Sequence, residues 1–138
     1  MRVNQLARKL DVTGDTVRFY TRIGLLEPDR NPANGYKEYG SGDERLLRFI
    51  LSARQLGFSV DDIGQILRTS RQGVSPCPLA RQLIQQRLEE NERRFQDSAR
   101  LRQRMLDAIE TWRQKPDREP TGDMICHLIE EFEVASHS

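Results

Sequence analysis

Cys77 and Cys126 are the two cysteines of this sequence, and their chemistry stands out among its residues. Cys77 lies between two prolines, and either Ser75 or Cys77 itself is expected to be the N-cap of a long helix. Cys126 follows Asp123 by three residues, so with Asp123 as a cap it falls in the first turn of a last helix. Unpaired backbone N–H groups and the helix dipole favour a thiolate at such positions. Both thiols are therefore predicted to bind metal or to react readily.

Three uses of these thiols follow from the residues around them. A soft divalent ion such as zinc would need further ligands, whereas mercury or a monovalent ion could accept two thiolates alone. The candidate further ligands are His127, Asp117, Glu119 and Asp123. Alternatively, oxidation or an electrophile could link or modify Cys77 and Cys126. In a third interpretation both cysteines are small buried hydrophobic residues, and His127 is a surface residue.

The adjacent pair Cys126 and His127 could suggest a nucleophile and its base, but the sequence argues against an enzyme. Neighbouring residues on a helix point about 100° apart. Neither an orienting third group nor a glycine pattern for an oxyanion hole accompanies the pair. We therefore expect no catalytic residues. The alternative hypothesis from another functional class is that the chain is a coiled-coil module that binds other proteins.

The chain has 138 residues, of which 36% are hydrophobic and 31% are charged. This length suits one domain or a small domain with an extension, and the apolar content is below what a compact domain of this size buries. An elongated, helix-rich molecule or an oligomer is implied. No run approaches the roughly 20 apolar residues of a membrane span, and residues 1–5 contain no signal-peptide core. We therefore expect a cytoplasmic protein without membrane contact.

Positive charge is concentrated in the first part of the chain, although the formal net charge of the whole chain is only +1. Residues 1–54 contain ten Lys and Arg against seven Asp and Glu, whereas the remainder contains twelve against fourteen. This asymmetry permits a phosphate-facing surface in the N-terminal part without proving one.

The beginning of the sequence predicts two short helices around a tight turn. Apolar residues at three- to four-residue spacing indicate the first helix, and they are Val3, Leu6, Ala7 and Leu10. Thr13 is expected to be the N-cap of the second helix, and Gly24 is expected to end it. Two short helices joined in this way are typical of a helix-turn-helix.

The next segment predicts a wing and a pair of helices. The dipeptide Asn34-Gly35 readily supplies positive φ at a hairpin turn, which predicts the wing. Ser41–Glu44 has the pattern of a capping box that opens a third helix, which Gly57 closes. Ser59 is expected to open a fourth helix, and a polar linker follows at 69–75.

The longest uninterrupted helical pattern runs from Pro78 to about Gln114. Alternate steps of three and four residues trace one seam along it, apolar with polar interruptions. The seam residues are Cys77, Arg81, Ile84, Leu88, Asn91, Phe95, Ser98, Arg102, Met105, Ile109 and Trp112. Such a helix extends about 50 Å, more than this small chain can cover, so a second copy is expected to bury the seam in an antiparallel dimer. The alternative is a solvated helix that lies on the N-terminal domain of its own chain.

A loop at 116–122 and a short final helix complete the chain. Asp123 is expected to cap this helix. The residues expected on its apolar face are Ile125, Leu128, Ile129 and Phe132. Residues 135–138 are expected to fray.

Several of these segments resemble MerR-type transcriptional regulators. The matching motifs are Thr16–Tyr20, Ile23–Leu26, Asn34–Lys37, Tyr39 and Ala53–Ser59. The match covers residues 1 to about 70 and implies a winged helix-turn-helix DNA-binding domain at 1–70. It further implies a dimerisation coiled-coil helix at 76–114 and an effector-sensing loop with a short helix at 115–138. The expected fold class is therefore mainly α.

This resemblance also implies a function. Members of the family are bacterial homodimers that bind double-stranded promoter DNA with an overlong spacer between its promoter elements. When the effector arrives, they bend and untwist that DNA so that the RNA polymerase holoenzyme can use it. We therefore expect a sequence-specific transcription regulator in the bacterial cytoplasm.

The expected DNA contacts come from the second helix, the wing and the third helix. Thr16 and Arg18 come early on the second helix, where side chains reach the floor of the major groove and an Arg can donate two bonds to a guanine edge. The other expected DNA-binding residues are Tyr20, Asn34, Tyr36, Lys37, Tyr39 and Arg54. Arg54 matches a phosphate contact of the family. For Tyr20 and Tyr39 the alternative is core packing with the hydroxyl at the rim.

The metal-responsive branch of the family offers a match for both cysteines. In that branch a cysteine matching Cys77 comes from one protomer, and loop cysteines come from the other, the last of them matching Cys126. Those relatives have at least one more loop cysteine, whereas residues 113–125 contain neither Cys nor His. The resemblance thus implies a thiophilic ion, such as zinc, cadmium, mercury, lead or copper, at Cys77, Cys126 and His127. Thiol-based sensing of oxidants or electrophiles remains the alternative.

Overall fold

The computed structural model describes residues 1–132, and the expected fraying of 135–138 lies outside them. The chain divides into two compact units, Met1–Leu88 and Glu89–Ser138. Helices dominate both units, and the first also contains a small two-stranded sheet. In the described part of the chain, no helix combines the length and the apolar character needed to cross a membrane.

Two short helices with a tight connection open the first unit. Helix α1 spans Val3–Lys9 and α2 spans Gly14–Arg22. As predicted, Thr13 is the N-cap of α2, and its Oγ1 accepts the backbone N–H of Thr16 at 3.2 Å. Gly24 follows α2 with a φ of +85°, a left-handed conformation that glycine adopts without strain. The predicted helix-turn-helix is therefore confirmed.

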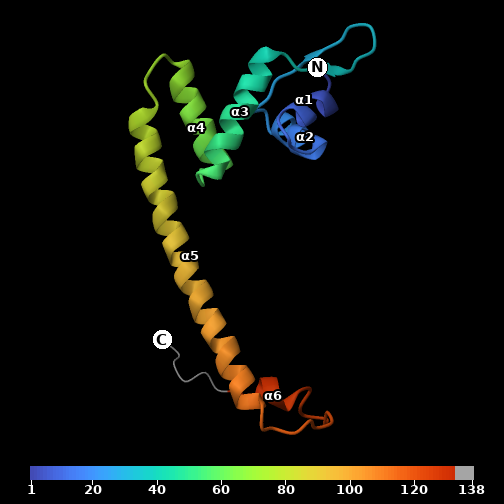
Figure 1. Cartoon of the computed structure of the whole chain (residues 1–138), viewed down its shortest axis with the longest axis vertical. Coiled ribbons are helices and arrows are strands. Elements are labelled where there is room, and N and C mark those ends of the chain that lie inside the picture. The colour runs from blue at the N-terminus through green and yellow to red at the C-terminus, as the bar shows by residue number, and fades with distance from the viewer. Residues whose placement is uncertain (133–138) are drawn as a thin grey trace. The chain divides into compact units, whose positions relative to one another are not determined.

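The wing is a short antiparallel hairpin. Strand β1 spans Asp29–Arg30 and β2 spans Lys37–Glu38, with Asp29 opposite Glu38 and Arg30 opposite Lys37. In the loop between them Gly35 has a φ of +73°, and the Asn34 side chain accepts the backbone N–H of Tyr36 at 2.9 Å. Figure 1 shows this loop projecting away from the helices of its unit.

Helix α3 spans Ser41–Gln55, and its N-cap differs from the prediction. Gly40, not Ser41, is the N-cap residue, because the Asp43 carboxylate reaches back to the backbone N–H of Gly40 at 3.0 Å. Gly57 follows the helix with a φ of +98°, which agrees with its expected role in closing it.

Helix α4 spans Val60–Arg71 and has the capping box expected from its sequence. Ser59 Oγ accepts the Asp62 backbone N–H at 3.0 Å, and Asp62 Oδ2 accepts the Ser59 backbone N–H at 2.9 Å. The helix continues into the predicted linker, which therefore begins after Arg71 rather than at residue 69. Gly73, with a φ of +76°, ends this continuation.

The core of the first unit is formed by α1–α4 together with the beginning of α5, which spans Cys77–Trp112. The fully buried large side chains are Tyr39, Leu6, Leu26, Leu47, Ile50, Ile63 and Val17. Leu83 of α5 joins this core. An ion pair adds to the contact, because Arg87 Nε lies 3.2 Å from Oδ2 of Asp62, which is only 3% exposed.

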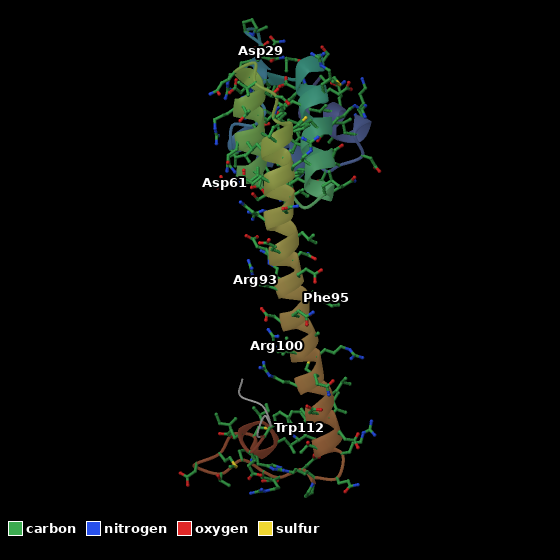
Figure 2. All side chains as sticks on the ribbon, turned by 90° about the vertical axis from the view of Figure 1, so that its left-hand side faces the viewer. Asp29, Asp61, Arg93, Phe95, Arg100 and Trp112 are labelled. Atoms are coloured by element: carbon green, nitrogen blue, oxygen red, sulfur yellow. The ribbon has the colours of Figure 1, made fainter. Side chains whose placement is uncertain are left out.

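The second unit contains the rest of α5, the following loop and α6, which spans His127–Glu130. Trp112 fixes the end of α5 to this segment, because its indole N–H donates to the Leu128 carbonyl at 3.1 Å and its ring meets Phe132 edge-on. Figure 2 shows Trp112 beside the loop that follows α5. The final helix thus begins three residues later than a cap at Asp123 predicted, and Cys126 is its N-cap residue.

Large apolar side chains along α5 remain exposed within the single chain. Phe95 is 66% exposed and projects from the helix in Figure 2. The others are Leu88, Leu101, Met105, Leu106 and Ile109. Four of the predicted seam positions are among these exposed residues, and Ala108 is the α5 residue buried within the second unit.

Candidate functional site

A basic groove lies between α1, α2 and the wing. It encloses about 720 Å³ and is lined by Arg2, Val3, Asn4, Gln5, Arg8, Arg18, Arg30, Gly35, Tyr36, Lys37 and Tyr39. Four arginines and one lysine contribute to this lining, and none of the lining residues carries a carboxylate side chain. A concave surface with one sign of charge attracts polyanions and places them close to the aligned cations.

Arg18 brings α2 into this groove. Its Nη2 lies 3.0 Å from Asp15 Oδ1 one turn earlier on the same helix. The guanidinium also passes close to Gly14, where a Cβ atom would lie 2.9 Å from Arg18 Nη2 and 2.9 Å from Asn4 Oδ1. The absence of a side chain at Gly14 therefore gives Arg18 and Asn4 room above the start of α2.

The wing contributes an exposed aromatic ring and two cations. Tyr36 is largely exposed, and the guanidinium carbon of Arg2 lies 4.3 Å from the centre of its ring. Arg30 Nη1 donates to the Gly35 carbonyl at 3.2 Å. Lys37 is exposed on β2. The structure thus brings the predicted residues Arg18, Tyr36 and Lys37 together, although they come from different elements.

Tyr20 and Tyr39 have their rings in the core, as the packing alternative expected. Tyr20 is 6% exposed and Tyr39 is 2% exposed. The Tyr39 hydroxyl lies 2.7 Å from Thr21 Oγ1, which in turn donates to the Val17 carbonyl at 2.9 Å. Tyr39 still reaches the groove lining. A phosphate contact by either hydroxyl stays a prediction.

The other expected DNA contacts lie outside the groove lining. Thr16 Oγ1 lies 3.0 Å from Thr13 Oγ1 at the start of α2. Asn34 uses its side chain within the wing loop. Arg54, near the end of α3, donates to the Phe58 carbonyl at 2.8 Å. Conversely, sequence reasoning did not assign Arg2, Arg8 or Arg30 to the site, and the excess of positive charge before residue 55 was their only signal.

The two cysteines lie in different local environments. Cys77 is the first residue of α5 and is exposed, and its backbone N–H donates to Ser75 Oγ at 3.3 Å. Cys126 is half-buried, and the carboxylate of Glu130 accepts the N–H groups of Cys126 at 2.7 Å and of Ile125 at 2.8 Å. The prediction that Cys126 lies in the first turn of the last helix is wrong, because Cys126 is the N-cap residue of α6 and the Glu130 carboxylate accepts its N–H group.

His127 is buried, not on the surface as one interpretation held. It is 8% exposed, and its Nε2 lies 3.2 Å from the Pro116 carbonyl oxygen. Its Nδ1 lies 3.8 Å from Oε2 of Glu131, whose other oxygen is 3.5 Å from Arg118 Nη1. When the Nε2–H tautomer donates to Pro116, Nδ1 keeps its lone pair, an arrangement typical of histidine ligands.

The metal ligands in the described part of the chain do not gather into one cluster. Within residues 1–132, no group of three or more His, Cys, Asp or Glu side chains is arranged to hold a metal ion. The candidate ligands Asp117, Glu119 and Asp123 are exposed.

A helix-turn-helix whose second helix shares a basic groove with a wing defines the class of winged-helix DNA-binding proteins. Comparison with known families agrees. Residues 1–70 match the model of the MerR HTH family of regulatory proteins, and residues 44–108 match the MerR DNA-binding model. The chain belongs to the MerR family, whose members are transcription regulators rather than enzymes.

Named transcription regulators, one of them from a mercuric resistance operon, are among the similar proteins. The HTH-type transcriptional regulator ZntR of Escherichia coli K12 is 34% identical over 114 residues, 78% of this chain and 79% of that protein. The mercuric resistance operon regulatory protein of Pseudomonas fluorescens is 36% identical over 100 residues, 72% of this chain and 67% of that protein. The fold matches the lead(II) complex of PbrR691 from Ralstonia metallidurans CH34 with a TM-score of 0.71 and 21% identity, over 96% of this chain and 99% of that one.

Proposed function

We propose that this member of the MerR family binds promoter DNA as a homodimer in the bacterial cytoplasm and remodels it for the RNA polymerase holoenzyme in response to an effector. The basic groove that Arg18 of α2 shares with Tyr36 and Lys37 of the wing carries the DNA-binding part of this proposal. Exposed apolar side chains along α5 support the dimer, because a second copy would remove them from water.

The test of DNA binding starts from a duplex that the wild-type protein selects from a random-sequence pool. We expect tight binding to this duplex and much weaker binding to a scrambled duplex of the same composition. We also expect a steep linear fall of log K with log salt concentration, because bound phosphates release counterions. Equal affinity for both duplexes would contradict a sequence-specific regulator.

We further propose that the effector is a thiophilic metal ion such as zinc, cadmium, mercury, lead or copper. Cys77 of one subunit, and Cys126 and His127 of the other, would hold it. The buried His127 ring supports this proposal, because its Nε2 faces the Pro116 carbonyl and leaves Nδ1 as a possible ligand atom. The similarity to a mercuric resistance operon regulatory protein supports it independently.

Equilibrium dialysis of the reduced protein against each of these ions tests the metal proposal. Either Cys77→Ser or Cys126→Ser should abolish the response to the ion, and the two changes should be non-additive because a shared site is lost with its first ligand. DNA binding without the ion should remain, since neither cysteine lines the basic groove. Binding of none of these ions, together with a Cys77–Cys126 disulfide formed under peroxide, would favour redox sensing instead.

A further inference from the structure

Arg2 lies just before α1 and makes an aromatic contact with the wing. Its guanidinium carbon is 4.3 Å from the centre of the Tyr36 ring, within the range of a cation–π interaction. The backbone N–H of Arg2 donates to the Gln5 side chain at 2.8 Å, which fixes the residue to the first turn of α1. The side chain of Arg2 thus connects the first helix to the wing.

Two backbone hydrogen bonds hold the neighbouring residue against the same hairpin. The Tyr39 N–H donates to the Met1 carbonyl at 2.6 Å, and the Met1 nitrogen donates to the Tyr39 carbonyl at 2.7 Å. The Tyr39 ring is buried, so this pairing attaches Met1 to a residue of the core of the unit. Arg2 is therefore held in place on both sides, by Met1 and by Gln5.

The charge around Arg2 suits a phosphate. It lines the groove together with Arg8, Arg18, Arg30 and Lys37. A guanidinium has five N–H donors, and a cation–π contact of its carbon with a ring does not use them as hydrogen bonds to a carboxylate would, so they can match the oxygens of a phosphate group. The arrangement thus leaves the donors of Arg2 available for an anion in the groove.

We propose that Arg2 contacts a DNA phosphate and positions Tyr36 within the DNA interface. This inference rests on the proposed function, because it requires DNA in the groove. It adds the N-terminal end of the chain to a surface for which the sequence indicated only α2, the wing and α3. The ligand is the sugar-phosphate backbone of duplex DNA, so Arg2 contributes to affinity for all sequences.

The first experiment measures DNA affinity at several salt concentrations for Arg2→Ala and for a matched control, Arg71→Ala. Arg71 is an exposed arginine in the last turn of α4 and does not line the groove. We expect Arg2→Ala to weaken binding about tenfold on both the selected and the scrambled duplex, and to lower the salt slope by about one for each bound subunit. Arg71→Ala should change neither quantity appreciably.

The second experiment separates the charge of Arg2 from its stacking. Arg2→Lys keeps the charge and loses the planar fork, so it should retain the salt slope and lose part of the affinity. In a Tyr36→Leu background the effect of Arg2→Ala should fall from about tenfold to about threefold, because the ring that Arg2 positions is absent. Strictly additive effects would refute the positioning role.

Unchanged affinity and salt slope in Arg2→Ala would overturn the phosphate contact. This outcome is distinguishable from failure of the proposed function, in which the wild-type protein itself would show no salt-dependent preference for its selected duplex. Circular dichroism of each variant identifies a loss of folding, and Arg2→Lys still tests the stacking contribution if Arg2→Ala fails to fold.

Discussion

Arg18 and Lys37 line the same groove but are expected to affect DNA binding differently. Arg18→Ala should cost about 1–3 kcal/mol and relax sequence preference, because an arginine on α2 can donate two bonds to a guanine edge. Lys37→Ala should weaken all sequences similarly and lower the salt slope by about one per subunit, since a wing lysine contacts phosphate. Titrations of both variants against the selected and scrambled duplexes measure this difference. Wild-type binding by Arg18→Ala would contradict the assignment of α2 as the recognition helix.

A single ion pair between α1 and α3 gives the first unit a defined pH dependence. The Lys9 ammonium lies 2.7 Å from Glu44 Oε1, and this hydrogen bond lowers the pKa of Glu44, with a smaller contribution from the charge of Arg48. A folded-state pKa below the unfolded value means that the pair stabilises the fold at neutral pH. This stabilisation is lost as the pH falls through the folded pKa of Glu44.

Removing the cation tests this interpretation. Lys9→Met should raise the pKa of Glu44 towards its ordinary value and make unfolding less dependent on pH in the acid range. An NMR titration of the Glu44 carboxyl in both proteins measures the change directly. An identical titration curve in Lys9→Met would show that another group sets the pKa of this carboxylate.

Residue types and local spacing predicted part of the groove. Arg18, Tyr36 and Lys37 could be assigned because they stand in short motifs of the resemblance. Arg2 could not be assigned, because it contacts Tyr36 only when the wing folds back beside the start of α1, and no local sequence pattern indicates this contact. The burial of His127 was missed for the same reason, since it depends on Pro116 across a loop.

At the scale of the helix, N-terminal caps show which local signals are sufficient. The predictions of Thr13 and Ser59 as caps were correct. Each side chain accepts a backbone N–H only three residues later in the sequence, so the cap depends on local sequence alone. The cap predicted at Ser41 lies one residue earlier, at Gly40, because the Asp43 carboxylate accepts the backbone N–H of Gly40. The prediction of Asp123 as a cap was wrong because Glu130, which lies later in the chain, accepts the N–H groups of Ile125 and Cys126 before α6.

Asp62 links α4 to the beginning of α5, and its removal should destabilise the first unit. Its carboxylate caps α4 through Ser59 and pairs with Arg87 while almost fully buried. Asp62→Ala is therefore expected to lower the free energy of unfolding by about 2–4 kcal/mol. The neighbouring exposed carboxylate gives a control, because Asp61→Ala should cost less than about 1 kcal/mol. Urea unfolding followed by circular dichroism measures both values, and equal losses would argue against the buried pair.

For the whole molecule, the exposed apolar side chains of α5 predict an obligatory partner copy. Leu88→Asp should convert the expected dimer into a monomer, because it would place an unpaired charge in the seam at a cost of several kcal/mol. Gln96→Asp introduces the same charge on the same helix away from the seam and should leave the dimer intact. Light scattering at micromolar concentration gives the mass of each variant. A monomeric mass for the wild-type chain would refute the dimer.

The missing side chain at Gly14 implies a compromise between thermal stability and DNA binding. A glycine in the interior of a helix is less favourable than alanine by roughly 0.5–1 kcal/mol, and because Gly14 is the first residue of α2, Gly14→Ala should raise the melting temperature only slightly. The added methyl group would displace the flexible ends of Arg18 and Asn4 over the start of α2, and DNA affinity should fall. Thermal unfolding and DNA titration of this one variant measure both effects. If both the melting temperature and the DNA affinity rose, the site would not need the space that this glycine provides. If the melting temperature rose and the DNA affinity fell, Gly14 would be a position where stabilising the protein conflicts with its activity.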